Sequence, residues 1–131
     1  MNEWPKCEID EYGNKFWMNE EWEYHREDGP AVIFADGDKW WYKNGLSHRD
    51  GGPAIEYANG DKFWYKNDES HREDGPACEC VNGYKSWYIN GKRHREDGPA
   101  VEYPNGNKEY WLNGIRVEGK DLPINKEVSN G

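Results

Sequence analysis

The sequence predicts an all-β protein in which stacked β-hairpin repeats form an extended, curled antiparallel sheet, a ribbon one layer thick. The first observation is an internal repeat, since His25, His48, His71 and His94 follow one another at intervals of 23 residues. The second is a turn signal, Asp-Gly or Asn-Gly, between short runs of β-branched and aromatic residues. The third is composition: hydrophobic residues make up only 34% of the chain, yet 20 of 131 residues are Trp, Tyr or Phe. The many aromatic residues argue against a disordered chain, and the low hydrophobic content argues against a thick two-layer core.

The repeats are expected to form a single repeat domain over residues 1–131. Four complete units are predicted at 25–47, 48–70, 71–93 and 94–116, and each opens with His-Arg, acidic residues and Gly-Pro-Ala. A degenerate unit at 5–24 precedes them, with two extra residues, one in its turn at 10–13 and one before His25. The tail, 117–131, is expected to cap the last unit near residues 122–124 and then to fray. Atypical terminal units are usual in repeat arrays, because they close the ends of the stack.

Each unit is expected to be a β-hairpin with a two-residue type I′ turn, such as Asp-Gly at 36–37. Both central positions of that turn need positive φ, which Asp-Gly and Asn-Gly tolerate. The turn places Phe34 opposite Lys39 and Val32 opposite Trp41. Because side chains alternate across a strand, these four residues are predicted to share one buried, mainly apolar face.

The opposite face is predicted to be solvent-exposed. Its middle position is Ile33 in the first complete unit and Glu in the later three. The position across from it holds Trp40, then Phe63, then Ser and Glu. A position that is free to become Glu is expected to face solvent.

A second turn, Asn-Gly in three of the four complete units, is expected to send the chain back toward the strands. The unit 48–70 departs from the pattern, because Asp68 stands where the other units have Gly. If the turn keeps a type I′ shape, Asp68 must adopt positive φ, at a cost of about 1 kcal/mol relative to Gly. We predict this strained turn, so that Asp68→Gly would stabilise the protein; an opened, exposed loop at 68–70 is the alternative.

The tract Gly-Pro-Ala-x-x-Tyr-x-Asn-Gly-x-Lys-x-Trp-Tyr-x-Asn-Gly-x-x-His-Arg resembles the variant branch of the MORN-repeat group over residues 5–116. The resemblance implies β-hairpin repeats in an extended antiparallel sheet, as in many bacterial, phage and large-virus proteins. Gly-Pro-Ala and His-Arg stand where the standard MORN pattern is mostly Gly and Tyr. The lipid binding proposed for some MORN proteins is therefore not expected here.

The repeated His-Arg pairs lie beside carboxylates, and a histidine in such a place can act as a general base. Catalysis needs one asymmetric constellation in a pocket, whereas this group recurs in all four complete units. We therefore interpret these residues as structural parts of the hairpins, with His bonded to turn backbone and Arg to neighbouring acids. They are His25, His48, His71, His94, Arg26, Arg49, Arg72 and Arg95. With no phosphate-binding loop or nucleophile motif in the sequence, we predict no enzyme, no catalytic residue and no cofactor.

The three cysteines are interpreted as small apolar core residues. Cys78 and Cys80 are two apart on one predicted strand and so share a face, and Cys7 is matched to the same position in the degenerate unit. Zinc needs four ligands, and no nearby His pair completes a set, so no metal site is predicted. An odd cysteine count without disulfide spacing suits a reducing compartment. Together with the lack of a signal-peptide pattern, it predicts a cytoplasmic protein.

The charge of the chain indicates the kind of partner. Asp and Glu number 26 against 17 Lys and Arg, a net charge of −9, which argues against direct binding to nucleic acid or to a membrane. Residues 1–24 alone hold seven acids and two lysines, together with Trp4 and Trp22. Tryptophans among acids are typical of protein interfaces, where aromatic anchors dominate the binding energy and charge steers the encounter. The alternative is that these tryptophans only cap the open edge of the sheet.

The sequence therefore predicts a non-enzymatic protein-binding module whose partner has a basic site. The candidate partner-binding residues are Trp4, Glu20, Glu21, Trp22, Trp40 and Phe63. The resemblance to phage and viral repeat proteins implies a small inhibitor of a host defence or nucleic-acid-processing protein. A nucleotide or other small-molecule sponge and a structural scaffold are the alternatives, and a homo-oligomer stays open.

Overall fold

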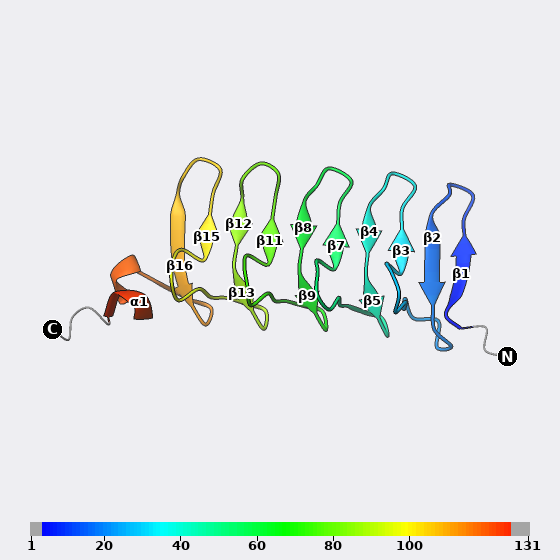
Figure 1. Ribbon diagram of the computed structural model, residues 1–131, viewed down its shortest axis with the longest axis horizontal. Coiled ribbons are helices and arrows are strands. Elements are labelled where there is room, and N and C mark those ends of the chain that lie inside the picture. Colours follow the sequence, from blue (N-terminus) through cyan, green and yellow to red (C-terminus); the bar gives the residue numbers. More distant parts are fainter. Residues whose placement is uncertain (1–3, 127–131) are drawn as a thin grey trace. The chain divides into compact units, whose positions relative to one another are not determined.

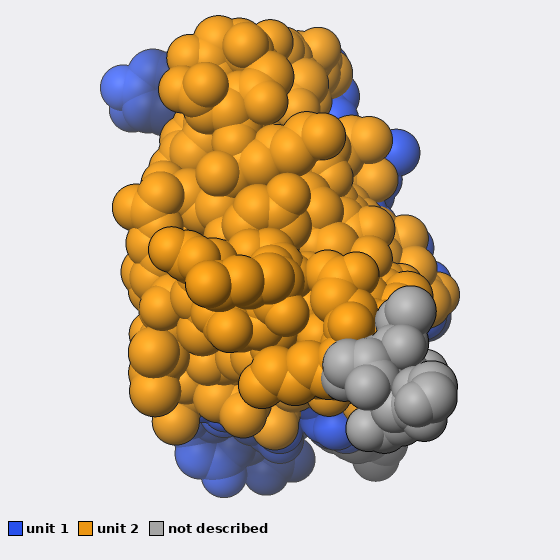
Figure 2. Space-filling model, turned by 90° about the vertical axis from the view of Figure 1, so that its left-hand side faces the viewer, with its two compact units in different colours: residues 1–69 blue, residues 70–131 orange. Residues whose placement is uncertain are grey.

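The computed structural model describes residues 4–126, and nearly all regular structure in this part of the chain is β (Figure 1). It contains seventeen short strands, followed by one 3₁₀ turn, η1 (Gly119–Asp121), and one helical turn, α1 (Pro123–Lys126). The predicted all-β class is confirmed. The chain divides into two compact units, residues 1–69 and 70–131 (Figure 2), which are described separately. The single repeat domain stays a prediction.

The main sheet is antiparallel and is built from one hairpin after another, as the repeats predict. In the first unit its strands follow the order β1 (Lys6–Ile9), β2 (Lys15–Met18), β3 (Val32–Ile33), β4 (Lys39–Trp40), β7 (Ile55–Glu56) and β8 (Lys62–Phe63). In the second unit the order is β11 (Cys78–Glu79), β12 (Lys85–Ser86), β15 (Val101–Glu102), β16 (Lys108–Leu112) and β17 (Ile115–Val117). Short hairpins form at the second turn of the repeats: β5 (Tyr42–Lys43) with β6 (Leu46–Ser47), β9 (Tyr65–Lys66) with β10 (Glu69–Ser70), and β13 (Tyr88–Ile89) with β14 (Lys92–Arg93).

The Asp-Gly turn is one residue longer than predicted. The Phe34 N–H donates to the Asp38 carbonyl and the Gly37 N–H donates to the Phe34 carbonyl, both at 2.9 Å, which leaves three loop residues, 35–37. Of these, Gly37 has positive φ (+103°) while Asp36 does not. This is the pattern of a type I turn followed by a left-handed glycine, so the predicted type I′ turn is wrong. The Asp36 carboxylate favours the observed loop, because it accepts the Asp38 N–H at 3.0 Å.

The longer loop shifts the register of the hairpin by one residue. Val32 lies opposite Trp40 and Ile33 lies opposite Lys39, so the predicted pairs of Val32 with Trp41 and of Phe34 with Lys39 are wrong. A one-residue shift moves the side chains of a strand to the other face. One face of the first unit therefore carries an apolar row: Phe16, Val32, Trp40, Ile55 and Phe63. The predictions that Trp40 and Phe63 lie on a solvated face, and that Lys39 lies on the apolar one, are wrong.

The other face of the sheet carries facing opposite charges. Lys39 lies opposite Glu56, which in turn lies opposite Lys62. In the second unit Glu79, Lys85, Glu102 and Lys108 follow one another across the strands in the same way. Opposite charges across neighbouring strands are mildly stabilising. The glutamates that replace Ile33 in later units thus complete a charge ladder.

The second turn of each complete unit has the left-handed shape that the sequence predicts. Asn44 and Gly45, for example, have φ of +48° and +80°. Asn67 and Asp68 adopt the same shape, with φ of +47° and +69°, so the strained turn at Asp68 is confirmed and the opened loop is not observed. Asp68 also makes a bond that glycine cannot make, because its carboxylate accepts the Ser47 N–H at 2.7 Å.

Asp68→Gly is accordingly expected to change the free energy of unfolding by less than about 0.5 kcal/mol, instead of stabilising the protein. Relief of the strain at positive φ would raise the free energy of unfolding, and loss of the hydrogen bond from Ser47 would lower it by a similar amount. Asp68→Ala keeps the strain and loses the bond, so it should cost about 1–2 kcal/mol. Urea unfolding of the wild type and both variants measures the two effects, and a clearly stabilised Asp68→Gly variant would contradict the assigned balance.

The degenerate N-terminal unit has an ordinary first turn. The Asp10 N–H donates to the Asn14 carbonyl at 3.0 Å, and the Gly13 N–H donates to the Asp10 carbonyl at 3.2 Å, as in the complete units. The extra residue predicted in this turn is therefore absent, and counting back from the turn aligns Cys7 with Ala31. Cys7 is exposed, so its predicted core position is wrong.

Cys78 and Cys80 share a face, as predicted, since their Sγ atoms lie 3.7 Å apart. Cys78 is buried and Cys80 is partly buried.

At the C-terminal end of the described chain, Leu122 is buried after η1, as a cap requires, whereas Ile124 is exposed. The expected fraying concerns residues 127–131, which lie outside the described residues. Within 4–126, no helix has the length and apolar character needed to cross a membrane.

Candidate functional site

The repeat arginines are packed into the fold. Arg26 donates from Nε to the Asp28 carboxylate at 3.0 Å and from Nη1 to the Pro30 carbonyl at 3.2 Å. Its guanidinium carbon lies 3.9 Å from the ring centroid of Trp17. A Cβ added to Gly29 would lie only 2.9 Å from the same carbon. We call this arrangement of Arg, Trp, Gly and the Pro carbonyl the arginine clamp.

The clamp recurs in the complete units. Arg49 lies 3.9 Å from the Trp41 centroid and Arg95 lies 4.0 Å from the Trp87 centroid. The bond to the proline carbonyl recurs at 3.1, 3.0 and 3.0 Å for Arg49, Arg72 and Arg95. The N–H groups that make these contacts can bind an anionic ligand only if the contacts break.

The repeat histidines make one common contact. In each complete unit, Nδ1 accepts the backbone N–H of the first residue of the second turn, at 2.9–3.1 Å; the pairs are His25–Asn44, His48–Asn67, His71–Asn90 and His94–Asn113. In three of these units Nε2 faces an acid, as in the pairs His25–Glu27, His48–Asp50 and His71–Glu73, at 3.0–3.5 Å. A neutral imidazole with its proton on Nε2 satisfies both contacts. The recurrence supports a structural role, and His25 combines it with a place in the pocket described below.

The extra residue of the N-terminal unit lies in its second turn, just before His25, where one of the two was expected. The Trp22 N–H donates to the Asn19 carbonyl at 3.0 Å, and the Asn19 N–H donates to the Glu23 carbonyl at 2.9 Å. The Asn19 side chain also accepts the N–H groups of Glu21 and Glu23, each at 3.0 Å. Trp22 thereby occupies the left-handed position (φ +60°) that glycine holds in the other three-residue loops. A bulky residue in this conformation is strained by about 1–2 kcal/mol, and such strain is typical of functional positions.

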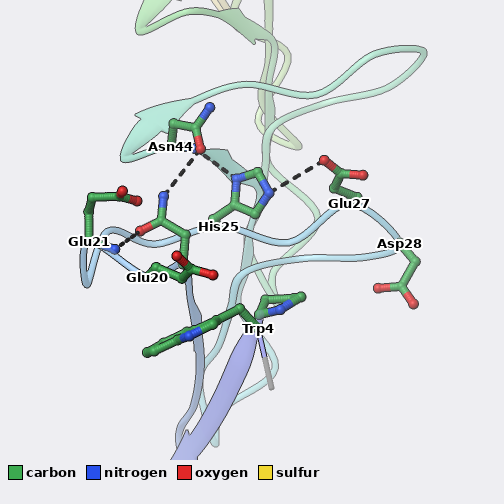
Figure 3. Close-up of a pocket in the computed structure, with 9 residues that line it drawn as sticks. Trp4, Glu20, Glu21, His25, Glu27, Asp28 and Asn44 are labelled. Atoms are coloured by element: carbon green, nitrogen blue, oxygen red, sulfur yellow. Dashed lines mark hydrogen bonds and ion pairs between the residues drawn. The ribbon is translucent and has the colours of Figure 1, made fainter. Parts of the chain in front are cut away.

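Next to this loop lies a pocket of about 600 Å³ (Figure 3). We call it the N-terminal pocket, and it is lined by Trp4, Pro5, Asn19, Glu20, Glu21, His25, Glu27, Asp28 and Asn44. Figure 3 shows Glu20, Glu21, Glu27 and Asp28 spread along the pocket, with Glu27 facing His25. No lysine or arginine is among these lining residues. Carboxylates that line a pocket together with an aromatic ring suit a cationic group.

Trp22 does not line the pocket but contacts Trp4, which does. Its ring meets the Trp4 ring edge to face, with centroids 5.3 Å apart and planes at 89°. Lys6 Nζ lies 5.6 Å from the centroid of the Trp22 ring, and Trp22 remains 59% exposed. An exposed aromatic ring supported by a second one is suited to anchor a partner.

The structure gathers four of the six predicted partner-binding residues, Trp4, Glu20, Glu21 and Trp22, at this end of the chain. Trp40 and Phe63 lie elsewhere, in the apolar row of the sheet. Trp40 Nε1 is buried and has no hydrogen-bond partner in the part of the chain that the structure describes.

Six pocket residues have no place in the interface predicted from the sequence: Pro5, Asn19, His25, Glu27, Asp28 and Asn44. The signal that could have found them is the extra residue at the second turn. It lies directly before the His-Arg-Glu-Asp string that supplies Glu27 and Asp28.

No protein-family model and no curated protein matches the chain. Among residues 4–126, no group of three or more His, Cys, Asp or Glu side chains is arranged to hold a metal ion. The interpretation of the site therefore rests on its own geometry and chemistry.

Proposed function

We propose that the protein is a non-enzymatic binding module that receives a basic site of another protein in the N-terminal pocket. The observation that carries the proposal is that Glu20, Glu21, Glu27 and Asp28 line one pocket together with Trp4. The exposed, strained Trp22, which contacts Trp4, adds an anchor for the surrounding surface of the partner.

A lysine or arginine side chain matches this pocket in two ways. Its charge forms strong, charge-assisted hydrogen bonds with carboxylates. Over the face of an aromatic ring it gains about 0.5–1 kcal/mol at an exposed site and about 2 kcal/mol when desolvated. The excess of acids in residues 1–24 would also speed the encounter with a basic surface.

The alternative of a nucleotide sponge is less well supported. A phosphate needs guanidinium donors, and in the described arginine clamps part of these donors are already bonded to carbonyls and carboxylates, beside indole rings. The resemblance to variant MORN repeats of phage and large-virus proteins favours one biological role. In that role the module inhibits a host defence or nucleic-acid-processing protein in the cytoplasm by covering its basic site.

The experiment is a calorimetric titration of the protein with hexalysine, beside a titration with ATP. Glu20→Gln/Glu21→Gln is expected to weaken hexalysine binding about tenfold at low salt, because two pocket charges are lost. The matched control is Glu69→Gln/Glu96→Gln, which removes the same charge from exposed acids outside the pocket. The control is expected to weaken binding less than about threefold. Equal weakening by both variants would contradict a defined site, and tighter binding of ATP than of hexalysine would favour the sponge.

A further inference from the structure

The first strand of the sheet has an open edge. β1 is first in the strand order, pairs with β2 alone, and all four of its residues are exposed (Figure 1). Cys7 lies opposite Trp17, whose own N–H donates to the Ala31 carbonyl at 2.7 Å and whose carbonyl accepts the His25 N–H at 2.9 Å. Since Trp17 directs its backbone groups toward the next hairpin, those of Cys7 point the other way, to the outer edge.

The alternation of an antiparallel ladder assigns Ile9 to the same outer edge. Two N–H groups and two carbonyls, those of Cys7 and Ile9, are thus directed away from β2. The Ile9 side chain is 63% exposed. A strand edge of this kind, with its backbone unpaired and apolar side chains exposed, is a template for one more strand.

The other terminal strand is followed by a covering segment. After β17 the chain continues into η1 and α1, and Leu122 between them is only 1% exposed. Within residues 4–126, no segment pairs with the outer edge of β1. Among the described residues, the outer edge of β1 is therefore accessible.

We infer that an extended segment of the partner adds to β1 as a further antiparallel strand. This inference rests on the proposed function and names the form in which the partner binds. A second copy of this chain is the poorer occupant, because pairing two β1 edges would bring together two ends that each hold seven acids and two lysines in residues 1–24.

The side chains of β1 indicate the sequence of that segment. Glu8 lies on the face of Phe16, its cross-strand partner, while Cys7 and Ile9 lie on the opposite face. A basic residue beside Glu8 and apolar residues beside Cys7 and Ile9 would form favourable cross-strand pairs. Lys6 shares the face of Glu8, so one basic residue between two apolar ones fits better than a run of basic residues.

The test titrates the isotope-labelled protein with the blocked peptide Thr-Val-Lys-Val-Thr and follows the amide signals by NMR. We expect the signals of Cys7 and Ile9 to shift and these amides to gain protection from hydrogen exchange. Ile9→Pro removes one outward N–H and leaves the hydrogen bonds between β1 and β2 intact. It should weaken peptide binding about tenfold. Ile9→Thr keeps the N–H, so its affinity for the peptide should stay within about threefold of the wild-type affinity.

A peptide with N-methylated valines provides a second measurement on the unaltered protein, which keeps the test valid if Ile9→Pro fails to fold. It presents the same side chains without the strand hydrogen bonds, so its binding should be lost. Thr-Val-Glu-Val-Thr, with Glu in place of Lys, should bind at least about tenfold more weakly than the lysine peptide.

The outcomes separate this inference from the proposed function. If binding of Thr-Val-Lys-Val-Thr is weakened by Glu20→Gln/Glu21→Gln but not by Ile9→Pro, strand addition is overturned and the proposed pocket remains. Binding weakened by Ile9→Pro alone would support strand addition and overturn the pocket. A dimer of the free protein that Ile9→Pro dissociates would show that a second copy is the occupant, which overturns the inference.

Discussion

Replacing Gly98 with alanine is expected to lower the free energy of unfolding by about 2 kcal/mol. A Cβ at this position would lie 2.8 Å from the guanidinium carbon of Arg95, well inside van der Waals contact. The Trp87 ring restricts the movement of the guanidinium, because its centroid lies 4.0 Å from the guanidinium carbon. The carboxylate of Asp97 and the carbonyl of Pro99 also hold it, each at 3.0 Å. The variant must therefore give up either the stack on Trp87 or these hydrogen bonds.

A double-mutant cycle measured by chemical denaturation isolates this cause. With Arg95→Ala already in place, Gly98→Ala should cost less than about 0.5 kcal/mol, because the group that the new methyl meets is gone. Gly98 does not have the positive φ of the turn glycines, so backbone strain predicts no difference between the two backgrounds. An equal cost with and without Arg95 would contradict the arginine clamp.

The features that the sequence predicts correctly are those that local residues decide. The period of the repeats, the hairpins and the left-handed second turns depend on His-Arg, Gly-Pro and Asn-Gly within a single unit. Asp68 illustrates the point, since its positive φ follows from the shape that its own turn must keep. Only the carboxylate's bond to Ser47, which lies 21 residues away in the sequence, had to come from the structure.

The register could not be predicted, because contacts between hairpins select the loop. Asp-Gly is compatible with a two-residue and with a three-residue loop. The Ala35 N–H, inside the three-residue loop, donates to the Asn14 side chain at 2.7 Å, and the Ala58 N–H donates to the Asp38 side chain at the same distance. These bonds join neighbouring hairpins and have no signature within one repeat.

The candidate site follows the same division. Trp4, Glu20, Glu21 and Trp22 could be predicted because they stand outside the repeat pattern, where acids and tryptophans gather. Trp40 and Phe63 were included on the basis of the wrong register. Asp28 belongs to the repeated string, so its sequence context predicts only the ion pair with Arg26, which the structure contains. Its place in the pocket depends on the neighbouring three-residue loop.

His71→Ala is expected to lower the free energy of unfolding by about 3 kcal/mol. The imidazole is only 12% exposed, and its Nδ1 accepts the Asn90 N–H at 2.9 Å. Alanine would leave this N–H unpaired in a turn whose Asn90 has φ of +50°, and would leave a cavity beside it. His71→Asn can place an amide oxygen near the position of Nδ1, so it should lower the free energy of unfolding about half as much as His71→Ala does. Thermal and urea unfolding of both variants measure the difference.

Two controls decide whether this loss is structural. Glu73→Gln alters the exposed acid that faces Nε2 at 3.5 Å, and it should change stability by less than about 0.5 kcal/mol. His71 lies in the second unit and is not among the residues of the N-terminal pocket. His71→Ala should therefore leave hexalysine binding unchanged at temperatures where the variant is folded. A variant that kept wild-type stability but lost binding would overturn the structural role of the histidines, because a residue that only supports its turn cannot affect a ligand without affecting the fold.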